Sequence, residues 1–213
     1  MRKLMFLVVV ALILTGCTKI DSNLDSVVNA TMKSENLAVN TVSTGYELYV
    51  PTGVMQVLDN EYNQKFKIKD TYIYLYVDTI SYYYKNMLNY KLESDYNYYY
   101  KMLQLGNKTG YIGINKISDD NFLCEIVYNY SKIEFYSDLI DLPIVMANSL
   151  IIQNSIKFND NLIRLELNND SNDSREIKYE LEKPKDSEST FSKYLQEYVA
   201  PDSNEEVELP DED

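Results

Sequence analysis

Apolar and polar residues alternate most clearly between residues 71 and 84. The odd positions from 73 to 77 are aliphatic, and the even positions from 72 to 76 are all tyrosine. Because successive side chains of a strand point to opposite faces, this period of two places aliphatic groups on one face and phenol groups on the other. We therefore expect one strand over 71–84, with Leu75 in the core. Tyr72, Tyr74 and Tyr76 should lie on a face that is half wet or covered by a helix.

Shorter alternating segments predict the other strands. The segment 96–105 fits helix periodicity as well as strand periodicity. The tyrosines at 98–100 favour a strand there. The predicted strands are 46–50 and 54–58, joined as a hairpin through Pro51-Thr52-Gly53; 96–105; 109–117 and 122–136, paired as a long hairpin; and 161–167 and 177–182, joined by a polar loop.

Two segments have helical spacing instead. Leu24, Val28 and Met32 indicate an amphipathic helix within 21–39, and 138–156 is an apolar helix in which Pro143 is tolerable if Asp141 caps the first turn. Grouping the elements this way predicts an α+β domain over 21–183, an antiparallel sheet with one helix packed on each face. This order resembles the PsbP-like α/β/α sandwich, and the likeness implies no function.

The first sixteen residues have the layout of a secretory signal peptide. Arg2 and Lys3 precede an unbroken apolar run over 4–14. A helix of eleven residues is too short to cross a bilayer, which needs roughly twenty. We therefore interpret 1–16 as a leader and not as a membrane anchor.

The residues that follow carry a specific motif. Leu14-Thr15-Gly16-Cys17 resembles the lipobox of bacterial lipoproteins, in which the cysteine thiol takes a lipid and a peptidase cuts before it. The resemblance implies a mature chain that begins at Cys17, a lipidated tether over 17–20, and attachment by the lipid to the outer face of the cytoplasmic membrane. Two or more acyl chains give stable anchoring, whereas one gives reversible binding.

Charge distinguishes the C-terminal end and excludes one class of partner. The chain has a formal net charge of −13, and residues 184–213 contain ten acidic and two basic side chains with three prolines. We expect most of this tail to be disordered, because it has few apolar groups to offset its ordering entropy. An acidic protein of this kind also lacks the lysine and arginine clusters that bind nucleic acid.

The residue types argue against most catalysis. The chain has no histidine, which removes the usual general base and the commonest zinc ligand. Tyr128 and Lys132 have the Tyr-x-x-x-Lys spacing of short-chain dehydrogenases but no glycine-rich nucleotide loop, and the polar run 168–174 lacks the Gly and Glu of a calcium loop. We expect Cys124 to be a buried strand residue. No cofactor, metal site or catalytic residue is predicted.

The remaining candidates are aromatic. A platform of tyrosines could hold a partner's apolar edge or a glycan, although tyrosines can equally complete a sheet face or pack under a helix. We expect a non-enzymatic binding or assembly module whose partner is a protein or a cell-envelope polymer. The alternatives are a small-ligand-binding or sensing lipoprotein and a carboxylate-based cell-wall hydrolase. The candidate binding residues are Tyr72, Tyr74, Tyr76, Tyr98, Tyr99 and Tyr100.

Overall fold

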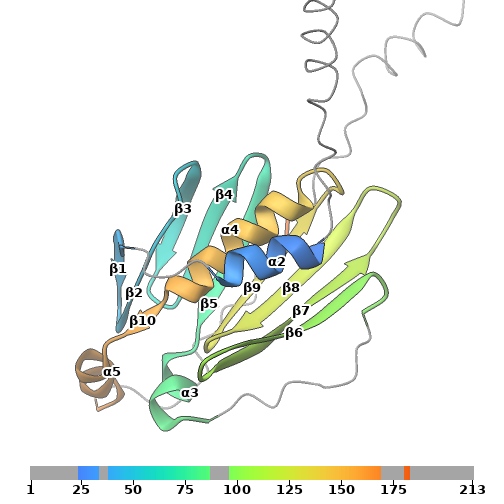
Figure 1. The fold of residues 1–213 in the computed structure, drawn as a ribbon. Helices are drawn as coiled ribbons and strands as arrows, with labels where there is room; N and C mark the ends of the chain where they lie inside the picture. The colour runs from blue at the N-terminus through green and yellow to red at the C-terminus, as the bar shows by residue number, and fades with distance from the viewer. Residues whose placement is uncertain (1–23, 34–37, 87–95, 169–179, 183–213) are drawn as a thin grey trace, which may run out of the picture.

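Two antiparallel sheets and four helices form the part of the chain that the structure, a computed structural model, describes: residues 24–33, 38–86, 96–168 and 180–182. The predicted leader, lipobox, tether and acidic tail lie outside these residues. The larger sheet has seven strands in the order β3-β4-β5-β9-β8-β7-β6 (Figure 1). In that order they are Val54–Asn60, Asn63–Ile68, Thr71–Val77, Ser131–Ser137, Phe122–Tyr128, Lys108–Lys116 and Tyr99–Leu105.

The smaller sheet and the helices complete this architecture. The small sheet has the order β1-β2-β10, with strands Thr41–Ser43, Tyr46–Leu48 and Lys157–Phe158. The helices are α2 (Leu24–Met32), α3 (Thr79–Tyr84), α4 (Leu142–Ser155) and α5 (Asp160–Leu167). The mixed α+β class and the antiparallel pairing are as predicted.

The core lies between one face of the large sheet and α4. Ile73, Leu75 and Val77 of β5 are at most 2 % exposed, as are Ile126 and Ile133 on the neighbouring strands. Leu75 pairs with Ile133, which in turn pairs with Ile126, so a continuous aliphatic row crosses the sheet. The aliphatic half of the predicted alternation in β5 is therefore the core face.

Both longer helices lie on this same face. In Figure 1, α4 crosses in front of the large sheet and α2 runs beside it, and the two helices pack directly on each other. The prediction of one helix on each face is therefore not met within the described residues, where the face opposite α4 carries neither α2 nor α4. The helix predicted within 21–39 is present but ends at Met32, well before the predicted boundary.

The predicted hairpin of 46–50 and 54–58 is wrong. β2 pairs with β1 and β10 in the small sheet, whereas β3 pairs with β4 in the large one. Pro51-Thr52-Gly53 therefore connects two sheets. The strand over 63–68 was not predicted, because the lysines at 65 and 67 interrupt the hydrophobic pattern.

The segment 71–84 is a strand only as far as Val77. Asp78 then caps α3: its side chain accepts a hydrogen bond from the Ser81 backbone N–H at 2.8 Å and another from the Ser81 hydroxyl at 2.7 Å. Aspartate at the N-cap position is a helix-start signal, and here it prevails over the strand preference of the tyrosines that follow. The ring of Tyr82 stacks on Phe158 at 3.8 Å between centroids and meets the edge of the Tyr130 ring at 5.5 Å.

The predicted strand 122–136 is two strands. Asn129 and Tyr130 both have positive φ, 52° and 56°, which makes the two-residue turn between β8 and β9. Such turns match the twist of a hairpin, and asparagine tolerates the left-handed conformation. The 109–117 strand is β7, as predicted, and it pairs with β8.

The C-terminal part differs most from the prediction. α4 forms where expected, with Pro143 in its first turn, but the Asp141 side chain makes no capping hydrogen bond and instead pairs with Lys69. Residues 161–167 form α5 rather than a strand, because the Asn159 side chain caps the Leu162 N–H at 3.2 Å. Of the predicted strand 177–182, residues 180–182 are not in a strand, and the rest lies outside the described residues.

Candidate interaction face

The sheet face opposite α2 and α4 is polar and aromatic; we call it the tyrosine face. Paired residues of adjacent antiparallel strands place their side chains on the same side, so the register defines this face. One row of pairs crosses six strands. In order, it consists of Lys65, Tyr74, Glu134, Glu125, Gly113 and Tyr100. The next row brings Tyr76, Lys132 and Tyr111 onto the same face.

Lysine and tyrosine side chains stack at the β4–β5 side of the tyrosine face. The Lys65 ammonium lies 4.1 Å from the ring centroid of Tyr72 and 5.1 Å from that of Tyr74, and the Lys67 ammonium lies 5.5 Å from the Tyr72 ring. A cation within about 6 Å of an aromatic ring face is attracted to it. Lys65 also forms an ion pair with Glu182, so the described C-terminal residues reach this side of the sheet.

A second cluster lies at the β6–β7 side and is organised by one carboxylate. Glu125 accepts hydrogen bonds from the hydroxyls of Tyr96 at 2.5 Å and Tyr111 at 2.6 Å. The ring of Tyr96 stacks on Tyr100 at 5.8 Å between centroids, and Tyr111 lies 6.0 Å from Tyr96 and 5.9 Å from Tyr100. Because all three centroid distances are within the range of aromatic contacts, the three rings pack on one another as one aromatic cluster.

A glycine makes this packing feasible. A Cβ placed on Gly113 would lie 2.2 Å from the Tyr96 ring, well inside van der Waals contact. The Tyr96 ring therefore lies directly on the backbone of β7. Any other residue at position 113 would displace the ring and its hydrogen bond to Glu125.

The environment of this cluster keeps its phenols protonated. Burial, together with hydrogen bonding to Glu125, raises the pKa of both Tyr96 and Tyr111 above the ordinary tyrosine value. A tyrosine with a raised pKa donates a hydrogen bond but does not act as a base near neutral pH. The cluster is thus equipped for packing and hydrogen bonding, not for proton abstraction.

The six predicted binding tyrosines do not form one site. Tyr72, Tyr74, Tyr76 and Tyr100 lie on the tyrosine face, although three strands separate β5 from β6, a distance of about 19 Å. Tyr74 is only 7 % exposed, so it is nearer to core than to surface.

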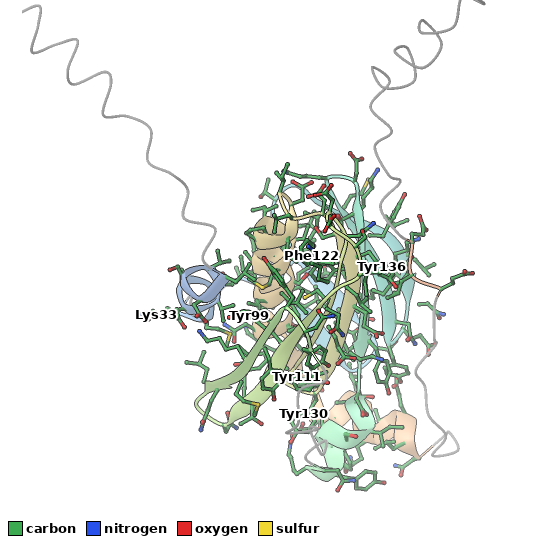
Figure 2. All side chains as sticks on the ribbon, turned by 90° about the vertical axis from the view of Figure 1, so that its right-hand side faces the viewer. Lys33, Tyr99, Tyr111, Phe122, Tyr130 and Tyr136 are labelled. Atoms are coloured by element: carbon green, nitrogen blue, oxygen red, sulfur yellow. The ribbon has the colours of Figure 1, made fainter. Side chains whose placement is uncertain are left out.

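Tyr99 points the other way, because adjacent residues of a strand alternate. Its hydroxyl donates to Asp25 of α2 at 2.9 Å, and burial raises its pKa. Tyr98 precedes β6 and packs on Phe122 at 4.6 Å between centroids. In Figure 2 Tyr99 lies toward α2, whereas Tyr136 lies on the opposite side of the sheet.

The other chemical candidates do not form a reactive site. Tyr128 lies on the core face and Lys132 on the tyrosine face, since their strands pair Tyr128 with Ser131 and Lys132 with Val127. Cys124 is fully buried in β8, as expected, and burial raises the pKa of its thiol. Among the residues described, no three metal-binding side chains come together.

Sequence reasoning missed four residues of the tyrosine face. Tyr96, the β7 residues Tyr111 and Gly113, and Glu125 of β8 come from three segments, and only the register brings them together. No local signal in the sequence indicated that Tyr111 and Glu125 meet. Searches against models of known protein families and against curated proteins find no match for this chain.

Proposed function

We propose that this protein is a lipid-anchored, non-enzymatic binding or assembly module on the outer face of the cytoplasmic membrane, and that it binds its partner through the tyrosine face. The observation that carries the binding part is the composition of this face. It presents half-exposed tyrosine rings beside lysines and carboxylates, and neither α2 nor α4 covers it.

Tyrosine suits a binding surface for physical reasons. Its ring gives a large contact area with only two rotatable side-chain bonds, and its hydroxyl can hydrogen-bond at the wet rim. On the tyrosine face the rings are held in place by stacking and by Glu125, so little conformational entropy would be lost on binding. Met102, 46 % exposed beside Tyr111 in the register, adds an adaptable apolar contact.

The anchoring part of the proposal rests on the lipobox-like residues ending at Cys17. Among the described helices, none is both long and apolar enough to span a membrane. The α/β/α sandwich suggested by element order would need a helix on the tyrosine face. That helix would have to come from residues outside the described ranges, and it would compete with the proposed partner.

The proposal is tested by affinity capture from solubilised envelopes, with three forms of the full chain as bait. The first is wild type, the second replaces Met102 and Tyr100 by serine, and the control replaces exposed Leu162 and Leu165 of α5 by serine. We expect a stoichiometric protein or polymer that wild type and the α5 control both retain and the face variant loses. Equal capture by all three baits would contradict the proposal, and a metabolite co-purifying with wild type would favour a small-ligand-binding lipoprotein.

A further inference from the structure

Exposed apolar side chains gather at one end of the large sheet, which we call the apolar end: Tyr98, Ile117, Leu139, Ile140 and Ile144. Ile140 is 86 % exposed and Ile117 is 51 % exposed. Leu139 and Ile140 form the tip of the loop between β9 and α4, and Ile144 lies in the first turn of α4. Clustered exposed apolar side chains are typical of interaction sites, whereas single ones need no explanation.

The register places these side chains at one end. Phe122 pairs with Ser137, so the β7–β8 turn that contains Ile117 lies beside the β9–α4 loop. Tyr98 packs on Phe122 and adds a ring to the same end. Five exposed apolar side chains thus lie at the same end of the sheet, although they come from separate parts of the chain.

The start of α2 lies at this end too. Asp25 bonds with Tyr99 and Lys101 at the beginning of β6, while Asn29, one turn later, bonds only with Lys101. Tyr99 pairs with Ile114, close to the β7–β8 turn, so α2 runs away from the apolar end. Figure 1 agrees: the starts of α2 and α4 lie on the same side of the molecule.

The chain length between Cys17 and Leu24 limits how far this end can be from an anchor. Seven Cα-to-Cα steps span at most about 25 Å when fully extended. A seven-residue strand is itself about 23 Å long, so the opposite end, with α5, lies a further strand length away. An anchor at Cys17 is therefore attached close to the apolar end, and this end can reach the membrane with the shortest stretch of the tether.

Charge does not oppose this contact as strongly as the acidic composition suggests. Two carboxylates at this end are paired with lysines: Asp141 with Lys69, and Asp119 with Lys116 at 3.0 Å. Pairing reduces the repulsion from a lipid surface, and the proximity that the anchor provides raises the effective concentration of the loop at the bilayer.

We propose that the apolar end is a lipid-contact surface: Leu139 and Ile140 enter the headgroup boundary of the membrane, and the tyrosine face then stands roughly perpendicular to the bilayer. This inference rests on the proposed lipid anchor. It adds an orientation, in which α5 points away from the membrane and the tyrosine face is open to a partner at the side.

Tryptophan reporters test this orientation, because the chain contains no tryptophan. Ile140→Trp places the reporter at the apolar end, and Leu165→Trp on exposed α5 is the matched control. Both full-length lipoproteins are purified from membranes and reconstituted in phosphatidylcholine vesicles with brominated acyl chains. We expect the tryptophan at 140 to shift its emission to the blue and to lose most of its fluorescence to bromine, while the one at 165 changes little.

Equal quenching at the two positions, or none at position 140 in protein that floats with the vesicles, would overturn the orientation. Mass analysis of the purified protein tests the anchor separately: absence of lipid on Cys17 would refute the proposed attachment. In that case chains coupled through Cys17 to a maleimide lipid still decide the orientation, because buried Cys124 does not compete for the reagent.

Discussion

Gly113→Ala should destabilise the protein only because of the ring above it. A Cβ at position 113 would lie 2.2 Å from the Tyr96 ring, so the ring must move and release Glu125. Losing a hydrogen bond to a charged group costs about 1.5–3 kcal/mol, and losing an aromatic contact costs about 0.5–1.5 kcal/mol. Alanine in place of glycine in a strand returns about 0.5–1 kcal/mol. We expect a net loss of about 1–4 kcal/mol in the free energy of unfolding.

A double-mutant cycle measured by urea denaturation isolates this effect. Gly113→Ala is compared in the wild-type background and in a Tyr96→Ala background, where the space above position 113 is open. In the second background the substitution should be neutral or slightly stabilising. An equal cost in both backgrounds would refute the reasoning, because the clash would then be with something other than Tyr96.

Three further predictions concern the core, the α2 contact and the anchor. Leu75→Ala should cost about 2–5 kcal/mol and Tyr76→Ala about 1 kcal/mol in urea denaturation, since the two residues lie on opposite faces of β5; equal costs would mean that both faces are core. The hydrogen bond from Lys101 holds the pKa of Asp25 below its usual 3.8, so this contact stabilises the fold above that pH and is lost as the pH falls through the lower value. Asp25→Asn should therefore lower the urea midpoint slightly at neutral pH and leave it unchanged in strong acid; a larger effect in acid would contradict the assignment. Cys17→Ser should abolish lipid labelling and leave the leader uncleaved, and a variant that is still labelled would disprove the proposed attachment.

The parts of the fold that sequence could predict are those where burial differs sharply between two faces. The alternation of 71–77 distinguishes a fully buried aliphatic side from a tyrosine side that is only partly exposed, and it predicted both the strand and its orientation. In α5 the leucines at 162 and 165 are exposed, so their spacing does not mark a side that packs on the core. This spacing led to the wrong prediction of a strand. There the cap at Asn159 decides the structure.

The candidate face was predictable only in part. Tyr72, Tyr76 and Tyr100 could be identified by composition and alternation, but the assignment of Tyr99 to the same set ignored the strand period. The cluster around Glu125 depends on which strands are neighbours, and that order is a long-range property of the sheet. β3 was likewise paired with β2 because they are close in sequence, whereas its partner is β4.

Photo-crosslinking in intact cells tests the central claim most directly. A photoreactive amino acid replaces Met102 on the tyrosine face or, as the control, Leu165 on α5; both side chains are exposed. We predict one discrete adduct from position 102 in the membrane fraction and none from position 165. The absence of an adduct from position 102, or the same adduct from both positions, would contradict a binding role for the tyrosine face.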